Sequence, residues 1–212
     1  MPGPAVTCVL GEGLGDPRSQ VAGASPAHVD GDLQAAFGRA RLLTGRPGWL
    51  IGAVENPFAP PAGFRAARLA KKAAAGAEFV QTQFVFDVPA FARWMAEVAG
   101  LGLAGRCGIL AGVGPVRSLR VLGHLRTAVP GLHIPDEVDR RLQAVPAGQV
   151  AEEGTRICVE IIEQVRAIPG VSGVHVMALG YEHGIPSILD RAGLARRDPA
   201  VSAPTLGGQR AH

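Results

Sequence analysis

The sequence predicts an α/β fold built around a parallel sheet, and three observations lead to this prediction. Five short apolar runs alternate along the chain with segments of helical periodicity, and alternating β and α units form parallel sheets. The apolar runs are nearly continuous, as expected of strands that are covered on both faces. The chain has 212 residues, fewer than the ~250 of a complete eight-stranded barrel, so a doubly wound sheet and a (β/α) barrel are both open.

The first half of the chain contains three of the expected strands. These strands are the apolar runs Val6–Leu10, Trp49–Val54 and Phe79–Phe86. The expected helices are Leu33–Leu43, Ala62–Ala75 and Pro89 to about Ala99. Gly76 follows the second helix and is typical of a C-cap, and Asp87 precedes the third as an N-cap. Residues 13–31 are rich in Gly, Pro, Ser and Asp and predict a long loop.

The second half contains two more strands and four helices. The expected strands are Cys107–Val113 and Val171–Leu179. The expected helices are Ser118–Thr127, Asp136 to about Gln143, Val150–Ile168 and Ile185–Ala192. Asp136 is expected to cap its helix, and the longest helix has its apolar residues at helical spacing on one face.

Composition favours one globular domain, residues 1–194, followed by a disordered tail at 195–212 that is rich in Arg, Pro, Gly and Ala. The net charge is only +3 and aromatic residues make up 5% of the chain, which argues against nucleic acid as a partner. No run reaches the ~18 apolar residues of a membrane span, and no signal peptide is visible. The three cysteines, Cys8, Cys107 and Cys158, are expected to be buried reduced thiols. We therefore expect a soluble cytoplasmic protein.

The segment from Gly11 to Asp16 suggests a dinucleotide fingerprint but departs from it. The third required glycine falls at Asp16, and the residues that follow predict a loop instead of a helix. Glu12 is of more interest as a single carboxylate at the carboxyl end of the first strand.

Two amides lie in a strand that should be apolar. Alternation places Gln81 and Gln83 on the same face, and burying an unpaired amide costs roughly 2–7 kcal/mol. Because polar side chains near the carboxyl end of a barrel strand lie at the active-site mouth, we expect Gln83 to contact a ligand. Gln81, one layer deeper, is expected to be an internal hydrogen-bonding partner.

A basic stripe on the helix at 62–75 has two interpretations. Arg65, Arg68 and Lys72 lie about 110° from the apolar face by the 3.6-residue repeat, whereas Lys71 points more directly toward solvent. The stripe is either a solvated face or a cradle for phosphate. Asn56, just after the preceding strand, either caps its loop or lines the site.

The histidines show no metal-ligand pattern, so no metal site is expected. His175 lies within a strand, where a hydrogen-bonded core histidine is the favoured interpretation. The segment Tyr181-Glu182-His183 follows the last strand and could line the site.

Together these segments resemble the methylenetetrahydrofolate reductase family. The similarity extends from about Ala5 to Leu194. The segments that carry it are Gly52-Ala53-Val54-Glu55-Asn56-Pro57-Phe58, Arg68-Leu69-Ala70-Lys71-Lys72, Ala75-Gly76-Ala77, Gln81-Thr82-Gln83-Phe84-Val85-Phe86-Asp87, Gly112-Val113-Gly114-Pro115, His133-Ile134-Pro135 and Gly173-Val174-His175-Val176-Met177.

The resemblance implies a partial (β/α)8 TIM barrel, with about five parallel strands, that binds FAD. It assigns Gly11, Glu12, Asn56, Arg68, Lys71 and Lys72 to the cofactor, Glu12 also to catalysis near the flavin and pterin rings, and Gln83 and Tyr181 to the substrate.

Three departures from the family pattern stand out. Leu125 replaces an aromatic residue that often packs on the pterin, and Tyr181 lies where an arginine can meet the folate tail. The family's first three strands, with the glutamate taken as proton donor, are not found in the chain.

The implied activity is FAD-dependent reduction of 5,10-methylenetetrahydrofolate to 5-methyltetrahydrofolate by NADH or NADPH, in one-carbon metabolism and methionine supply. The alternative is a non-catalytic subunit that completes a barrel with another chain or a second copy of itself. A phosphate-binding barrel enzyme of another chemistry is a third possibility.

Overall fold

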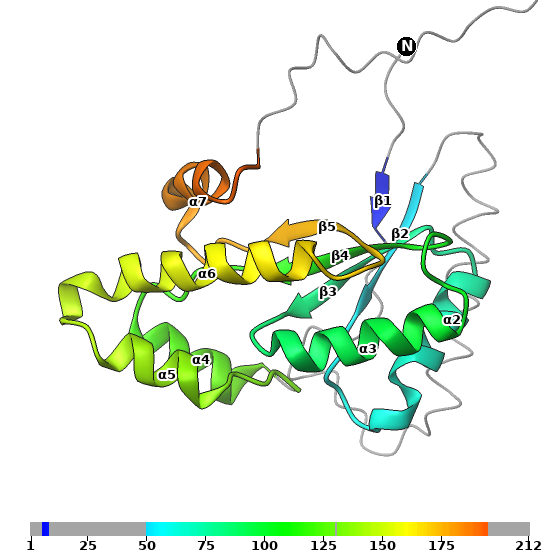
Figure 1. Cartoon of the computed structure of the whole chain (residues 1–212), viewed down its shortest axis with the longest axis horizontal. Coiled ribbons are helices and arrows are strands. Elements are labelled where there is room, and N and C mark those ends of the chain that lie inside the picture. Colours follow the sequence, from blue (N-terminus) through cyan, green and yellow to red (C-terminus); the bar gives the residue numbers. More distant parts are fainter. Residues whose placement is uncertain (1–5, 9–49, 130, 195–212) are drawn as a thin grey trace, which may run out of the picture.

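The computed structural model describes residues 6–8, 50–129 and 131–194. Within this part, five strands form one sheet in which each neighbouring pair is parallel (Figure 1). The strands are β1 (Val6–Cys8), β2 (Leu50–Glu55), β3 (Phe79–Phe84), β4 (Gly108–Val113) and β5 (Val171–Val176). The expected strands are confirmed, and their described ends differ from the expected ones by at most three residues. Val9 and Leu10, expected in the first strand, lie outside the described residues.

The order of the strands decides between the two predicted architectures. The strands lie in the sheet in chain order, β1-β2-β3-β4-β5. A doubly wound sheet reverses its order at a switch point, whereas each strand of a barrel is added beside the one before it. The fold is therefore a segment of a (β/α) barrel, and the predicted partial TIM barrel is confirmed.

Helices follow the strands along the described chain. They are the 3-10 turn η1 (Ala62–Phe64) with α2 (Arg65–Ala74), α3 (Val88–Gly100), α4 (Leu119–Ala128), α5 (Asp136–Gln143), the 3-10 turn η2 (Ala147–Gln149) with α6 (Val150–Arg166), and the 3-10 turn η3 (Glu182–Gly184) with α7 (Ile185–Arg191). These agree with the expected helices to within two residues. The helix expected at 33–43, the loop at 13–31 and the tail at 195–212 lie outside the described residues.

Two of the predicted helix-terminal residues are confirmed and one is corrected. Asp87 accepts a hydrogen bond from the backbone N–H of Ala90 at 2.8 Å, and Gly76 follows α2 with a φ of 111°. Asp136, in contrast, is the first residue of α5, and Pro135 occupies the N-cap position. Its carboxylate still lies in the first turn, where it interacts favourably with the helix dipole.

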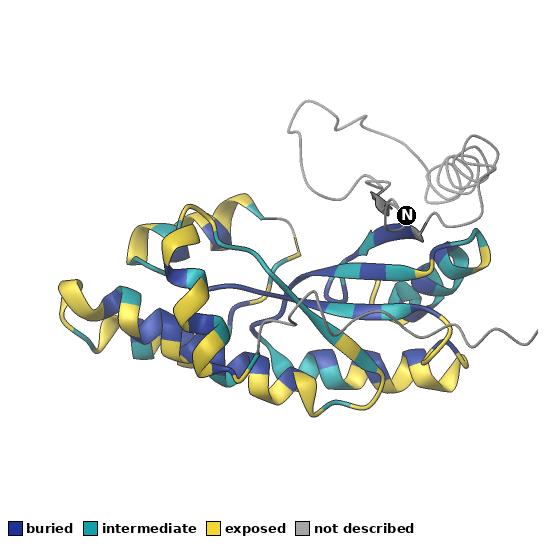
Figure 2. Ribbon diagram, turned by 90° about the horizontal axis from the view of Figure 1, so that it is seen from above, coloured by how far each residue is buried: buried dark blue, intermediate teal, exposed yellow. Residues whose placement is uncertain are grey.

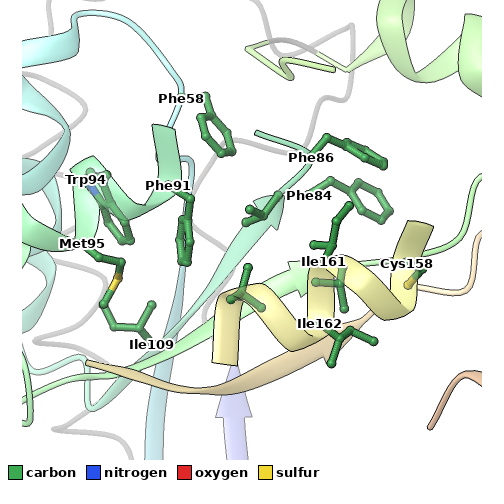
Figure 3. Packing of buried hydrophobic residues seen from close by; sticks show 14 of the residues in the cluster. Phe58, Phe84, Phe86, Phe91, Trp94, Met95, Ile109, Cys158, Ile161 and Ile162 are labelled. Atoms are coloured by element: carbon green, nitrogen blue, oxygen red, sulfur yellow. The ribbon is translucent and has the colours of Figure 1, made fainter. Parts of the chain in front are cut away.

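The core lies between the sheet and the helices that cover one of its faces. Figure 3 shows Phe91, Trp94 and Met95 of α3 and Ile161 and Ile162 of α6 packing toward the strands. All five are buried, and full burial of such a side chain contributes about 1.5–3 kcal/mol. Figure 2 shows the complementary pattern, in which the outer sides of these helices are exposed.

Helix α6 is fixed to its neighbours by close polar and backbone contacts. Arg141 of α5 binds Glu153 at 2.7 Å and Glu160 at 2.5 Å, both on α6. The Arg141 guanidinium lowers the pKa of Glu160 through this hydrogen bond. Gly154 of α6 lies against the backbone of Val116, and a Cβ there would come within 2.0 Å of the Val116 carbonyl oxygen. These contacts fix the position of the loop after β4, which contains Val116.

The side chains of two cysteines, Cys107 and Cys158, are described, and both are buried free thiols, as predicted. Burial raises the pKa of Cys107 to about 11 and that of Cys158 to about 12. The thiolate, which is the reactive form, is therefore scarce at neutral pH.

The described residues include no helix that is long and apolar enough to cross a membrane. They also contain no group of three or more His, Cys, Asp or Glu side chains that could hold a metal ion.

Candidate functional site

The carboxyl ends of β2 to β5 lie along one edge of the sheet, and the polar residues of interest follow them (Figure 1). Glu55 and Asn56 are at the end of β2, Thr82 and Gln83 at the end of β3, and Arg117 in the loop after β4. In (β/α) barrels the active site is built at this edge. We take it as the candidate site.

Glu55 is a buried carboxylate with two cationic partners. Its side chain is 1% exposed, and it accepts from Arg68 Nε at 3.1 Å and from Lys72 Nζ at 2.9 Å. Lys72 Nζ also donates to the carbonyl of Val54 at 2.6 Å. Alternation along β2 directs Glu55 to the same face as Ile51 and Ala53, toward α2. The helix thus supplies the counter-charges that a buried carboxylate requires.

The basic stripe on α2 therefore faces the end of β2. Arg65 donates to the carbonyls of Phe58 and Ala59 at 2.8 and 2.9 Å, and Arg68 Nη2 donates to the carbonyl of Asn56 at 3.0 Å. Lys72 is only 8% exposed, so the interpretation as a solvated face does not hold for it. The assignment of Arg68 and Lys72 to a flavin phosphate stays a prediction.

Asn56 and Lys71 flank this ion-paired group. Asn56 Oδ1 accepts from the backbone N–H of Phe58 at 2.9 Å, the loop-capping interaction considered from the sequence. Lys71 Nζ lies 4.7 Å from the centroid of the Phe64 ring, a cation–π distance. Its side chain is therefore less fully directed to solvent than the helical repeat predicted.

A bulge at the end of β3 sets the position of Gln83. The β3–β4 register shifts between Gln81 and Phe84, so the strict alternation on which the sequence argument relied is interrupted. Thr82 Oγ1 donates to the Gln83 carbonyl and accepts from the N–H of Gly112, both at 2.9 Å. The side chain of Gln83 is buried, and its Oε1 accepts from the N–H of Phe84 at 2.9 Å. Its Nε2 donates to no residue in the described part of the chain.

Glycines at the end of β4 allow its neighbours to approach closely. A Cβ on Gly112 would lie 2.3 Å from the Thr82 carbonyl oxygen, and one on Gly114 would lie 2.3 Å from the Met177 carbonyl oxygen. Both distances are shorter than any van der Waals contact. The ends of β3, β4 and β5 can therefore pack together only without side chains here.

His175 lies on β5 opposite Gly112. Its Nδ1 is buried and has no hydrogen-bond partner among the described residues, so the expected hydrogen-bonded histidine is not found at that atom. Burial lowers the pKa of His175 below its ordinary 6.5. The imidazole is therefore neutral at pH 7.

The remaining predicted residues are only partly described. Tyr181 is half-buried and its ring lies 4.6 Å from that of His183, edge to face. Gly11 and Glu12 lie outside the described residues. The structure thus brings Asn56, Arg68, Lys71 and Lys72 together at the end of β2, and it places Gln83 one strand away.

Sequence reasoning missed the roles of Glu55 and Arg117. Glu55 was named only within the segment 52–58, because its partners Arg68 and Lys72 are 13 and 17 residues away and meet it only through the packing of α2 on β2. Arg117 is half-buried, and its Nε is buried without a hydrogen-bond partner in the described part. A cation directly after a strand and a Gly-Pro turn was the signal available.

Comparison with known protein families adds a decisive observation to this geometry. The family model for methylenetetrahydrofolate reductase matches residues 59–193, which is more than half of the 212-residue chain. The chain belongs to the methylenetetrahydrofolate reductase family. Arg68, Lys71, Lys72, Gln83, Arg117 and Tyr181 all lie within the matched region.

A curated relative agrees with this family assignment, and a solved structure shares the fold. Methylenetetrahydrofolate reductase 2 of Saccharomyces cerevisiae is 27% identical over 141 residues, which cover 65% of this chain and 23% of the yeast protein. A protein from Clostridium thermocellum, which binds two copies of 5-methyl-5,6,7,8-tetrahydrofolic acid, has a similar fold. The two structures superimpose with a TM-score of 0.57 and are 16% identical in sequence. The matched region covers 75% of this chain and 57% of the Clostridium chain. The reductase family thus contains relatives much longer than the part matched here.

Proposed function

We propose that this chain takes part in FAD-dependent reduction of 5,10-methylenetetrahydrofolate to 5-methyltetrahydrofolate, with NADH or NADPH as electron donor. The match of the reductase family model to residues 59–193 carries the proposal. The fold shared with a protein that binds 5-methyltetrahydrofolic acid supports a folate as substrate.

The charge distribution on α2 fits a cofactor that contains a pyrophosphate. Arg65, Arg68, Lys71 and Lys72 lie on this helix, and the buried carboxylate of Glu55 pairs with two of them. The helix therefore keeps more positive charge than Glu55 neutralises. Arg68 is also 21% exposed at its side chain, so an anion can approach it while it remains bonded to Glu55. These residues, with Asn56, would hold the phosphates and ribose of FAD.

The protein's part in the reaction is to orient the reactants. FAD, when bound, would supply the redox chemistry, which is hydride transfer between the nucleotide and the folate. Gln83 would hold the folate and the nicotinamide in turn through its amide, whose position is fixed by the bond from Phe84 N–H to Oε1. Glu12 would act near the flavin and pterin rings.

The substitution Gln83→Glu tests this role without breaking the local structure. Glutamate keeps an oxygen that can accept from Phe84 N–H but removes the amide donor. In the FAD-loaded chain, we expect both half-reactions to slow by about tenfold to a hundredfold, the effect of misplaced reactants. Stopped-flow measurement of flavin absorbance, anaerobically with NADH or NADPH and then with the folate, gives both rates. Gln164→Glu, at an exposed site on α6, is the matched control. A wild-type flavin that neither nucleotide reduces, or that the folate does not reoxidise, would contradict the proposed function.

The second candidate is a non-catalytic subunit of a barrel that another chain completes. Strand β5 favours it, because β5 pairs with β4 on one side and with no described strand on the other, and unpaired sheet edges invite association. This candidate predicts a stable complex with a second chain and no flavin in the isolated protein.

A further inference from the structure

Arg117 differs from the other arginines near the candidate site in having no partner among the described residues. Arg65 and Arg68 each donate to two or more protein oxygens. Arg117 is half-buried, yet its Nε is shielded from solvent and bonds to no described residue. Leaving a buried donor unsatisfied costs free energy, and the cost is larger when the donor is charged. A bound anion would offset this cost.

The loop that carries Arg117 is rigidly placed at the carboxyl edge. Its neighbour Val116 packs on the backbone of Gly154 in α6. On its other side, the hydroxyl of Ser118 accepts from Val121 N–H at 3.2 Å and caps α4. A loop backbone held in this way loses little conformational entropy when a side chain on it binds a ligand.

Arg117 lies just before the positive end of a helix. The N-terminus of α4, which has a partial positive charge, begins two residues later and has no acidic residue in its first turn. Arg120 lies in that turn and is exposed. The region thus suits a negatively charged group.

The guanidinium also reaches the loop after β5. Its Nη2 lies 3.5 Å from the position of a Cβ on Gly180, which is next to Leu179. Leu179 has a φ of 49° and is 42% exposed, and Leu119 is 46% exposed. The cationic Arg117 side chain beside these exposed leucines is suited to a ligand that has an apolar part and a terminal anionic group.

We propose that Arg117 binds a carboxylate of the glutamate tail of the folate substrate. This inference rests on the proposed function and names the residue that recognises one part of the substrate. Tyr181, expected near the tail, has no charge to offer, whereas the planar guanidinium of Arg117 can accept a carboxylate through two parallel hydrogen bonds. Arg117 is thus a specificity-determining residue.

The test compares two ligands on the FAD-loaded full chain. One is 5-methyltetrahydrofolate and the other is a tetrahydropterin without the aminobenzoyl-glutamate tail. Arg117→Ala should weaken folate binding about tenfold or more, the effect of losing a charge-assisted hydrogen bond, and should leave the affinity for the pterin within about twofold. Arg117→Lys should restore part of the folate affinity, and Arg93→Ala, at an exposed site on α3, should change neither. Calorimetric titration gives all these affinities.

A measurement on the wild-type chain covers the case in which Arg117→Ala does not fold. The tail-less pterin, and a folate whose tail carboxylates are amidated, should each bind about tenfold more weakly than the folate. Equal affinity for all three would overturn the role of Arg117 and leave the proposed function intact. No binding of any of them would overturn both. An equal loss for folate and pterin in Arg117→Ala would show a structural role instead. A loss of NADPH binding but not of NADH binding would show that Arg117 holds the nucleotide phosphate.

Discussion

At the scale of single residues, Glu55 shows how the end of β2 is held in place. A carboxylate that is 1% exposed at its side chain is stable only with its charge compensated. Arg68 and Lys72 provide this compensation and are themselves fixed by it, together with the carbonyls of Asn56 and Val54. The ion-paired group thus orders both the strand end and the basic side chains assigned to FAD.

Replacing Glu55 should be strongly destabilising. Glu55→Gln keeps the shape but leaves the largely buried Lys72 and Arg68 without a counter-charge, and removing one partner of a buried pair costs about 3–5 kcal/mol. Urea unfolding followed by circular dichroism measures the free energy of unfolding. Glu97→Gln, at an exposed site on α3, should change it by less than about 0.5 kcal/mol. Equal stability of the two variants would show that the Glu55 ion pairs contribute nothing.

His175 should make stability depend on pH. Its pKa in the folded protein lies below the ordinary 6.5 because it is buried. Between these two pKa values the unfolded chain binds a proton that the folded protein does not, so stability falls as pH drops below about 6.5, by at most about 1.4 kcal/mol per pH unit. His175→Gln should flatten this slope just below pH 6.5, while His124→Gln, at an exposed site on α4, should keep it. Urea unfolding at several pH values measures the slope, and an unchanged slope in His175→Gln would contradict the assignment.

The role of a residue is easier to predict from the sequence when its contacts are with its neighbours in the chain than when they depend on tertiary packing. Asp87 was identified as a cap because capping involves only the next few residues. The partners of Glu55 depend on which side of β2 faces α2, and the unpaired Nε of Arg117 depends on how α6 and the loop after β5 lie. Neither arrangement is visible in a single stretch of sequence.

At the scale of elements, the backbone at the end of β3 depends on the Thr82 hydroxyl and on the absence of a side chain at Gly112 in β4. Thr82 Oγ1 takes the place of a backbone acceptor for Gly112 N–H, and the bulge lets Gln83 turn its Oε1 to its own strand. Gly112 is required because the backbone of β3 comes so close. The position of Gln83 thus depends on β4 as much as on β3.

Two glycine substitutions should have opposite effects. Gly112→Ala would place a Cβ 2.3 Å from the Thr82 carbonyl oxygen, and such overpacking costs about 1–3 kcal/mol or more. Gly123→Ala lies within α4 with nothing within 4 Å of the new Cβ, and it should stabilise by about 0.5–1 kcal/mol. Thermal unfolding of both variants measures the difference. If Gly112→Ala were as stable as Gly123→Ala, the close approach of β3 and β4 would be wrong.

The elements themselves were predictable because their signals are strong. The strands are buried apolar runs, and α6 has its apolar residues at helical spacing, so their types and approximate positions follow from the sequence. Strand β5 is three residues shorter than expected, since Met177 to Leu179 are apolar yet leave the sheet at the site edge. The bulge in β3 could not be predicted from alternation, because it depends on the Thr82 hydroxyl.

At the scale of the whole molecule, the described sheet is an open segment of a barrel. Its strands lie in chain order without a reversal, and the chain spans 23% of the length of the yeast reductase that it matches. The described residues assigned to FAD cluster at the end of β2, while Gln83 lies in β3 and Arg117 and Tyr181 follow β4 and β5. If this edge forms the site, the cofactor and folate would lie across neighbouring strand ends.

The most direct test of this account is titration of the purified full chain with FAD, followed by visible absorbance and by equilibrium dialysis. We expect bound flavin at about one per chain, with affinity about tenfold lower in Lys71→Ala, which removes a cation assigned to the cofactor, and unchanged in the Arg93→Ala control. A chain that binds no FAD would contradict the central claim that the carboxyl edge of this sheet is a flavin site.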